Sequence, residues 1–67
     1  MKYIWYKSEY EDIWKVSEDY SSYTIYYKRD NYIIPYSWKT TKNDFNNYKR
    51  DYKLKEISEG DAILEML

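Results

Sequence analysis

The chain has no cysteine and no histidine, and its 67 residues include one glycine and one proline. It therefore has no disulfide, no zinc site built from thiolate or imidazole ligands, and no imidazole for acid–base catalysis. The only glycine, Gly60, lies between acidic residues, which excludes the glycine-rich loop of a P-loop or dinucleotide-binding protein. So little glycine and proline also argues against a linker or a disordered tail.

Long apolar runs are also absent. No segment approaches the roughly 18 apolar residues of a membrane span, and the N-terminal MKYIWYKSEYE carries charges where a signal peptide has an apolar core. We therefore expect a cytoplasmic protein that does not enter a membrane. We also expect one domain, residues 1–67, which buries only about 60% of its unfolded surface. Aromatic packing and association with a second copy remain as sources of stability.

Aromatic residues are what the chain has in excess, with eleven tyrosines, three tryptophans and one phenylalanine. Lysine, asparagine and isoleucine, which like tyrosine have AT-rich codons, are also frequent, so codon bias accounts for part of the tyrosine excess. That bias is typical of a low-GC Gram-positive bacterium or one of its phages. It does not determine where the rings point.

The first half of the chain predicts two β-hairpins. Residues 2–7 and 13–16 are short aromatic and β-branched runs separated by a polar turn, with Ile13 departing from strict alternation. Residues 23–27 give the strongest strand signal, and the Asp30-Asn31 turn leads into a strand at 32–34. Pro35 lacks a backbone donor, so the last strand should end there or lie at a sheet edge.

The second half predicts helices. Thr41 and Asp44 have capping-box spacing, and ring-bearing residues then recur at helical intervals, which predicts a helix over residues 42–51. Ser58 and Asp61 repeat that spacing before a closing apolar segment that ends at Leu67. Residues 52–57 fit either a short fifth strand or a continuation of the helix.

Strands followed by helices indicate an α+β fold: a small antiparallel sheet of about four strands in two hairpins, with one or two short helices packed on a face. A small β-barrel with a C-terminal helix is the alternative. A single sheet covered on one side would leave tyrosines exposed on the other, and such a patch usually marks a contact site.

Acidic residues gather in two predicted loops, one with Glu9, Glu11 and Asp12 and one with Glu18 and Asp19. Paired carboxylates and a hard metal ion define a third hypothesis, a hydrolase. Solvated acidic turns are favoured by about five to one, and the ligand pattern of an EF-hand is missing. We therefore expect no catalytic residue, no cofactor and no metal ligand.

Residues 28–55 carry a positive charge excess interleaved with aromatic rings, whereas both flanking segments are acidic. Cations beside stackable rings are typical of proteins that bind single-stranded nucleic acid or a nucleotide. The reading in which these cations only solvate the surface is favoured by about two to one. The candidates for phosphate contact are Lys28, Arg29, Lys39, Lys42, Lys49, Arg50, Lys53 and Lys55.

In size and composition the whole chain resembles the small, aromatic-dense accessory proteins of phages of Gram-positive bacteria. That resemblance implies a non-enzymatic inhibitor of a host protein, such as a defence factor. Our leading hypothesis is accordingly a binding protein, expected to be a homo-oligomer, that engages a protein partner through tyrosine and tryptophan. Tyrosine, tryptophan and arginine are the residue types that dominate interface hot spots. The partner-binding candidates are therefore Tyr26, Tyr27, Arg29, Tyr36 and Trp38.

Overall fold

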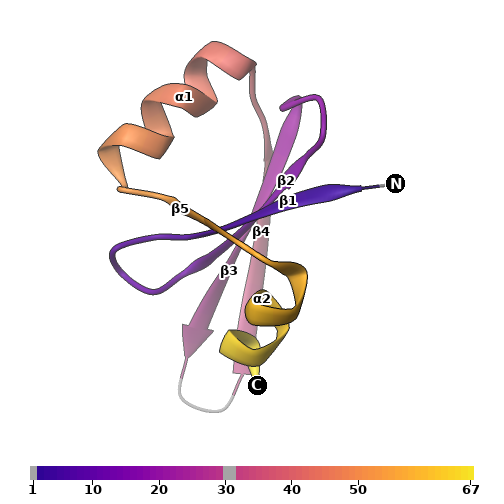
Figure 1. Cartoon of the computed structure of the whole chain (residues 1–67), viewed down its shortest axis with the longest axis vertical. Coiled ribbons are helices and arrows are strands. Elements are labelled where there is room, and N and C mark those ends of the chain that lie inside the picture. The colour runs from indigo at the N-terminus through magenta and orange to yellow at the C-terminus, as the bar shows by residue number, and fades with distance from the viewer. Residues whose placement is uncertain (1, 30–31) are drawn as a thin grey trace.

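A computed structural model describes residues 2–29 and 32–67, apart from the side chain of residue 29. It contains five strands and two helices (Figure 1). In chain order they are β1 (Tyr3–Lys7), β2 (Ile13–Ser17), β3 (Ser22–Arg29), β4 (Tyr32–Lys39), α1 (Lys42–Asp51), β5 (Lys55–Ile57) and α2 (Glu59–Met66).

The strands form one open antiparallel sheet in the order β4-β3-β2-β1-β5. Both expected hairpins are present, β1 with β2 and β3 with β4. The α+β prediction is therefore confirmed, and the sheet does not close into the alternative barrel. The Asp30-Asn31 turn lies outside the described residues.

Strand β4 continues past Pro35 to Lys39 and forms one edge of the sheet. Of the two outcomes expected for this proline, the edge position is therefore the correct one. The Thr40 N–H donates to the Ser21 carbonyl at 2.9 Å, so Ser21 and Thr40 are a hydrogen-bonded pair. Along an antiparallel register, hydrogen-bonded pairs alternate with pairs whose backbone groups do not bond to each other. Pro35, opposite Tyr26, consequently occupies a position whose backbone groups face away from β3, so its missing N–H removes no bond from the sheet.

The undecided segment 52–57 contains a turn and the short strand β5, which adds to the free edge of β1. Helix α1 ends because Lys53 adopts a left-handed conformation with φ 52°. The N–H groups of Leu54 and Lys53 then bond back to the carbonyls of Lys49 and Arg50, at 2.9 and 3.4 Å. These bonds form a Schellman motif, which turns the chain out of the helix and towards β1.

Both helices begin where their capping residues predicted. The Thr41 hydroxyl accepts a bond from the Asp44 N–H at 3.2 Å, and the Ser58 hydroxyl accepts one from the Asp61 N–H at 3.1 Å. Each bond satisfies a backbone donor that has no partner within its helix.

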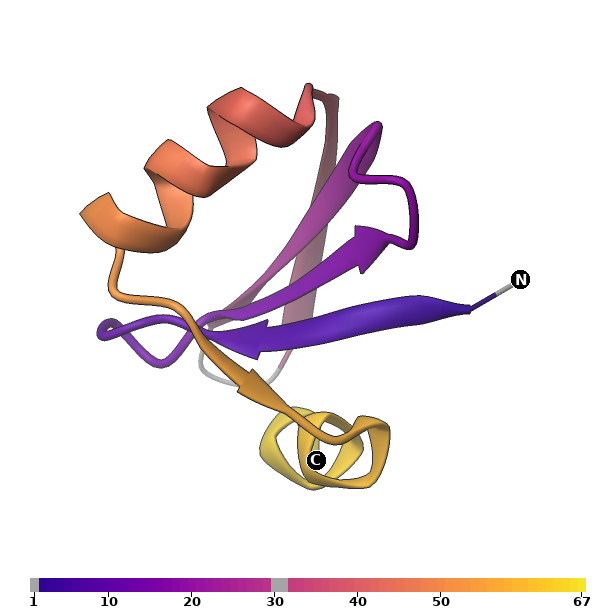
Figure 2. The ribbon, with the colours of Figure 1, turned by 45° about the horizontal axis from the view of Figure 1, so that its top comes forward.

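The helices lie on opposite faces of the sheet (Figure 2). Helix α1 inserts fully buried Phe45 against one face, 5.5 Å from Tyr6 and 6.1 Å from Trp14 between ring centroids. Helix α2 packs against the other face of β1 and β2, where Glu65 forms an ion pair with Lys7 at 3.1 Å. We call these the α1 face and the α2 face.

Each face has its own buried residues. The core on the α1 face is formed by Tyr6, Trp14, Val16, Ile25 and Phe45. Ile13 alternates onto the α2 face and is fully buried, as is Ala62 of α2. The interruption of alternation at Ile13 therefore reflects a strand that is covered on both sides at that point.

Candidate aromatic binding surface

A continuous row of rings crosses the α1 face from the interior to the edge of the sheet. Every second residue of a strand points to the same face, which places Tyr23 and Tyr27 of β3 beside Trp38 and Tyr36 of β4. Successive ring centroids lie 5.3 Å apart for Trp14–Tyr23, 5.4 Å for Tyr23–Trp38, 6.0 Å for Trp38–Tyr36 and 5.8 Å for Tyr36–Tyr27. We call these five residues the aromatic row.

The outer members of the row are exposed although they are held in place. Tyr36 is 52% exposed and Trp38 is 41% exposed, whereas Trp14 at the inner end is 3% exposed. Tyr52, just beyond α1, adds another ring at 41% exposure, 5.3 Å from Trp14. Because each exposed ring packs against another ring, binding through them would cost little conformational entropy.

Tyr23 joins the buried and exposed parts of the row. Burial raises the pKa of its phenol to about 12, with further contributions from the neighbouring Tyr48 through charge repulsion and a hydrogen bond. Tyr23 also packs 5.7 Å from Tyr48 and 6.1 Å from Phe45. Tyr23 thus anchors the row in the hydrophobic core. Its phenol remains uncharged at neutral pH.

The structure brings together three of the five partner-binding candidates, Tyr27, Tyr36 and Trp38. Tyr26 lies on the α2 face, where its ring stacks on Trp5 at 6.3 Å. The backbone of Arg29 pairs with Tyr32, but its side chain lies outside the described residues.

Sequence reasoning did not select Tyr23 and Tyr52 as site residues. Tyr23 shares the alternation of Tyr27 within the strongest strand of the chain, so the spacing of two residues was a usable signal. For Tyr52 the usable signal was its helical spacing from Phe45 and Tyr48, although its position also depends on how α1 ends against the β1–β2 loop. There the Glu9 N–H donates to the Tyr52 carbonyl at 3.2 Å.

The basic candidates are spread over several elements. Lys28 and Lys39 lie near opposite ends of the β3–β4 hairpin, and Lys55 is on β5 beside Lys7. On α1, the amino groups of Lys42 and Lys49 lie 5.9 and 5.4 Å from the ring centroids of Tyr20 and Tyr6. Arg50 contacts Asp51 at 3.3 Å, and Lys53 contacts Glu9 at 3.6 Å. The seven of these cations whose side chains the structure describes are not gathered along one track.

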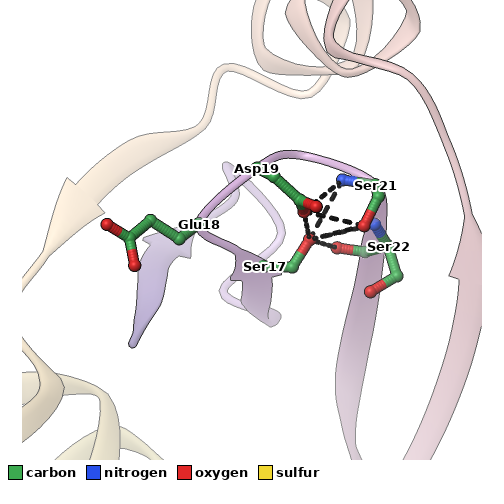
Figure 3. Close-up of a pocket in the computed structure, with 5 residues that line it drawn as sticks. All are labelled: Ser17, Glu18, Asp19, Ser21 and Ser22. Atoms are coloured by element: carbon green, nitrogen blue, oxygen red, sulfur yellow. Dashed lines mark hydrogen bonds between the residues drawn. The ribbon is translucent and has the colours of Figure 1, made fainter. Parts of the chain in front are cut away.

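An open pocket of about 490 Å³ lies at the β2–β3 turn, lined by Ser17, Glu18, Asp19, Ser21 and Ser22 (Figure 3). Asp19 Oδ1 accepts bonds from the hydroxyls of Ser17 and Ser21 at 2.9 and 2.7 Å, while the Glu18 side chain points away. Hydrogen bonds from Ser21, followed by those from Ser17, lower the pKa of Asp19. Its carboxylate therefore serves as an ionised acceptor that closes the turn.

Among residues 2–28 and 32–67, no three side chains of the metal-ligating types come together. In the same part of the chain, no helix has the length and apolar character needed to cross a membrane. Comparison with protein families, curated proteins and solved structures finds no match to this chain.

Proposed function

We propose that this chain is a non-enzymatic binding protein that engages a protein partner through its aromatic row. The supporting observation is that Tyr36 and Trp38 are about half exposed while their rings stack on one another, and Trp38 stacks on Tyr23, which packs against the buried core. Preorganised tyrosine and tryptophan side chains are the groups that contribute most to protein–protein hot spots. Lone exposed rings would carry much less weight, since scattered apolar side chains are normal on protein surfaces.

The distribution of charge favours a protein partner over a polyanion. Among the side chains that the structure describes, the exposed rings of the row are not flanked by a continuous set of cations, because the α1 lysines Lys42 and Lys49 lie over Tyr20 and Tyr6 instead. A nucleic-acid surface needs both stacking rings and neighbouring cations along the strand. Burial of flat rings against a complementary surface requires no cations.

The biological role that we propose is inhibition of a host protein, such as a defence factor, by a phage-encoded chain in the bacterial cytoplasm. The small size of the chain and its many residues with AT-rich codons support this part of the proposal. Inhibition by a chain without imidazole or thiol would work by occluding a surface of the target.

Binding should be tested with the variants Trp38→Ala and Tyr36→Ala against the control Tyr10→Ala. Tyr10 is 69% exposed, lies in the β1–β2 loop and is not a member of the row. Tagged wild-type chain would be incubated with host lysate, and the retained proteins would be identified and titrated. A partner that uses the row should lose at least about tenfold in affinity with either row variant, equivalent to 1.4 kcal/mol or more. Equal retention by all three variants would contradict the proposal.

The nucleic-acid hypothesis needs a separate measurement. Short fluorescent oligonucleotides and nucleotides would be titrated with the chain between 20 and 200 mM salt. Binding that weakens as salt rises would support phosphate contacts by the basic residues, because neutralised phosphates release counterions. Absence of binding at low salt would remove that alternative and leave protein binding as the proposed function.

A further inference from the structure

The outer edge of β4 has backbone groups that the sheet does not use. From the Thr40–Ser21 bond and the β3–β4 register, the even-numbered residues of β4 direct their N–H and C=O groups to β3. The odd-numbered residues direct theirs outward. These outward residues are Ile33, Pro35, Ser37 and Lys39, and Pro35 supplies a carbonyl only.

The two edges of the sheet differ in how they are protected against pairing. Strand β5 has three residues, and two of them, Lys55 and Glu56, are charged. Strand β4 has eight residues with no charged side chain before Lys39. Short length and charge discourage edge-to-edge pairing, whereas a long uncharged edge invites it. The protective features of β4 are Pro35 and, at its end, Lys39.

We propose that two copies of this chain associate by antiparallel pairing of their β4 edges, with the two-fold axis passing beside Tyr36. An axis there pairs Ile33 with Lys39 of the second copy and Pro35 with Ser37 of the second copy. Three hydrogen bonds follow, and symmetry doubles them to six. They are Ile33 N–H to Lys39 C=O, Lys39 N–H to Ile33 C=O, and Ser37 N–H to Pro35 C=O.

Other axis positions make fewer bonds. An axis at Pro35 places the two prolines opposite each other, where neither has an N–H, and leaves four bonds. An axis at Ser37 or at Trp38 also leaves four, because part of β4 then extends beyond its partner. The proline therefore selects the register instead of preventing the pairing.

The side chains on the α1 face complement each other in this register. Tyr36 lies opposite its own copy, and Trp38 lies opposite Ile34 of the second copy, in the close pairs that lack direct backbone bonds. Aromatic–aromatic and aromatic–β-branched pairs are among the favourable cross-strand combinations. Lys39 lies opposite Ile33, so the single cation of the strand does not face its own copy.

Two five-stranded sheets would thereby become one sheet of ten strands. The aromatic rows of the two copies would meet at the axis and remain open on the α1 face. This inference does not depend on the proposed function, because a dimer can form whether or not the rows bind a partner. Its test measures association of the purified chain alone.

The first test compares Ser37→Pro with Ser37→Ala. Proline removes the outward N–H that the dimer uses without removing an N–H that bonds to β3. Alanine keeps that N–H and, like proline, loses the hydroxyl that lies 2.8 Å from the Thr24 hydroxyl, so it is the matched control. Sedimentation equilibrium should show a dimer for wild type and Ser37→Ala. Loss of two bonds should weaken the Ser37→Pro dimer by about 30-fold.

The second test uses amide hydrogen exchange measured by NMR at two concentrations. The N–H groups of Ile33, Ser37 and Lys39 should gain protection as concentration rises. Those of Tyr36 and Trp38, which bond within the chain, should be protected equally at both concentrations. This alternation is specific to edge pairing and does not depend on any variant folding correctly.

The third test examines the axis. Tyr36→Lys and Tyr36→Glu each place like charges opposite each other, so each variant alone should be monomeric. A mixture should form heterodimers, because the opposite charges then face one another. A heterodimer at least about tenfold tighter than either homodimer is the expected result.

Three outcomes would overturn the inference. One is a monomer at all concentrations up to millimolar. Another is a dimer whose odd-numbered β4 amides show no concentration-dependent protection. The last is a dimer that survives Ser37→Pro but dissociates with Leu64→Lys, which would place the interface on α2, where Ile63, Leu64 and Leu67 are exposed.

Discussion

At the scale of single residues, several turns of this structure depend on left-handed backbone conformations. Among residues 2–29 and 32–67, three residues other than glycine adopt positive φ: Glu11 at 68°, Tyr20 at 60° and Lys53 at 52°. Each such conformation costs an L-residue roughly 1–2 kcal/mol. Tyr20 offsets this cost through its ring, 5.5 Å from Phe45, and through the contact of its hydroxyl with that of Tyr6 at 3.3 Å.

Lys53 has no comparable compensation, which leads to a prediction. Lys53→Gly should raise the free energy of unfolding by about 1 kcal/mol, because glycine relieves the left-handed strain at a Schellman position. The ion pair lost with Glu9 contributes little, since the lysine side chain is 75% exposed. Urea denaturation at pH 7 measures the change. Lys53→Ala, which loses the same ion pair but keeps the strain, is the control, and equal stability of both variants would disprove the explanation.

A second prediction at this scale concerns Asp19. Its folded pKa lies below the unfolded value, so ionised Asp19 stabilises the fold above the unfolded pKa, and this stabilisation is lost as pH falls through the folded pKa. The Ser21 hydroxyl is the largest cause, so Ser21→Ala should raise the pKa of Asp19. Titration followed by carboxyl ¹³C NMR measures the pKa of Asp19 in both proteins.

The matched control for that titration is Ser22→Ala. Ser22 joins the turn through its backbone N–H and carbonyl, both bonded to Ser17 Oγ, so truncating its side chain should leave the pKa of Asp19 unchanged. A pKa that rises equally in both variants would show that the turn had been disrupted in general, and would contradict a specific role for the Ser21 hydroxyl.

The residue scale also shows how far the candidate binding surface could be predicted. Tyr36 and Trp38 are two residues apart on an edge strand, and alternation puts them together. Tyr26 and Tyr27 are both predicted as partner-binding residues from their residue type, yet adjacent strand residues must point to opposite faces. Composition can identify which side chains suit an interface, but the period of the strand decides which of them share one.

At the scale of elements, the helix starts were predictable because the cause is local. Thr41 and Ser58 each bond a backbone N–H three residues later, and that spacing is visible in the sequence. The end of α1 was less visible, because its left-handed residue is a lysine where glycine is usual. The sequence of residues 52–57 fits strand and helix alike for another reason: the three residues of β5 carry almost no periodicity, and their pairing with β1 is a long-range effect.

The cap of α1 gives a third prediction. Thr41→Ala should lower the free energy of unfolding by about 1 kcal/mol, because the Asp44 N–H loses its partner. Thr41→Ser keeps the hydroxyl and should stay within about 0.5 kcal/mol of wild type. Thermal unfolding followed by circular dichroism compares the two variants. If serine were as destabilising as alanine, the threonine methyl group and not the cap would be responsible.

At the scale of the whole molecule, a small chain without disulfides places its sheet between two helices. Phe45 is buried beneath α1, and Ile13 with Ala62 are buried beneath α2, so two small cores share the central strands β1 and β2. The sequence predicted both helices but did not predict that they pack on opposite faces of the sheet. That choice depends on β5, which passes along the β1 edge and carries the chain to the other face (Figure 2).

Packing of this kind makes stability depend on tyrosines that remain neutral, which gives a last prediction. Burial raises the folded pKa of Tyr23 to about 12 and also raises that of Tyr6 above its ordinary value, against about 10 in an unfolded chain. The stabilisation is fully present below pH 10 and is lost as pH rises through the folded pKa, because only the unfolded state ionises readily. The free energy of unfolding should therefore fall steadily above pH 10.

The variant that isolates this effect is Tyr23→Phe, which keeps the ring and removes the phenol that would have to ionise. At pH 7 the variant should be somewhat less stable than wild type, since the hydrogen bond with Tyr48 is lost. Between pH 10 and 12 the difference should shrink and then reverse in favour of phenylalanine. Urea denaturation across this range measures both curves, and a parallel decline of the two would show that Tyr23 is not the residue whose ionisation unfolds the protein.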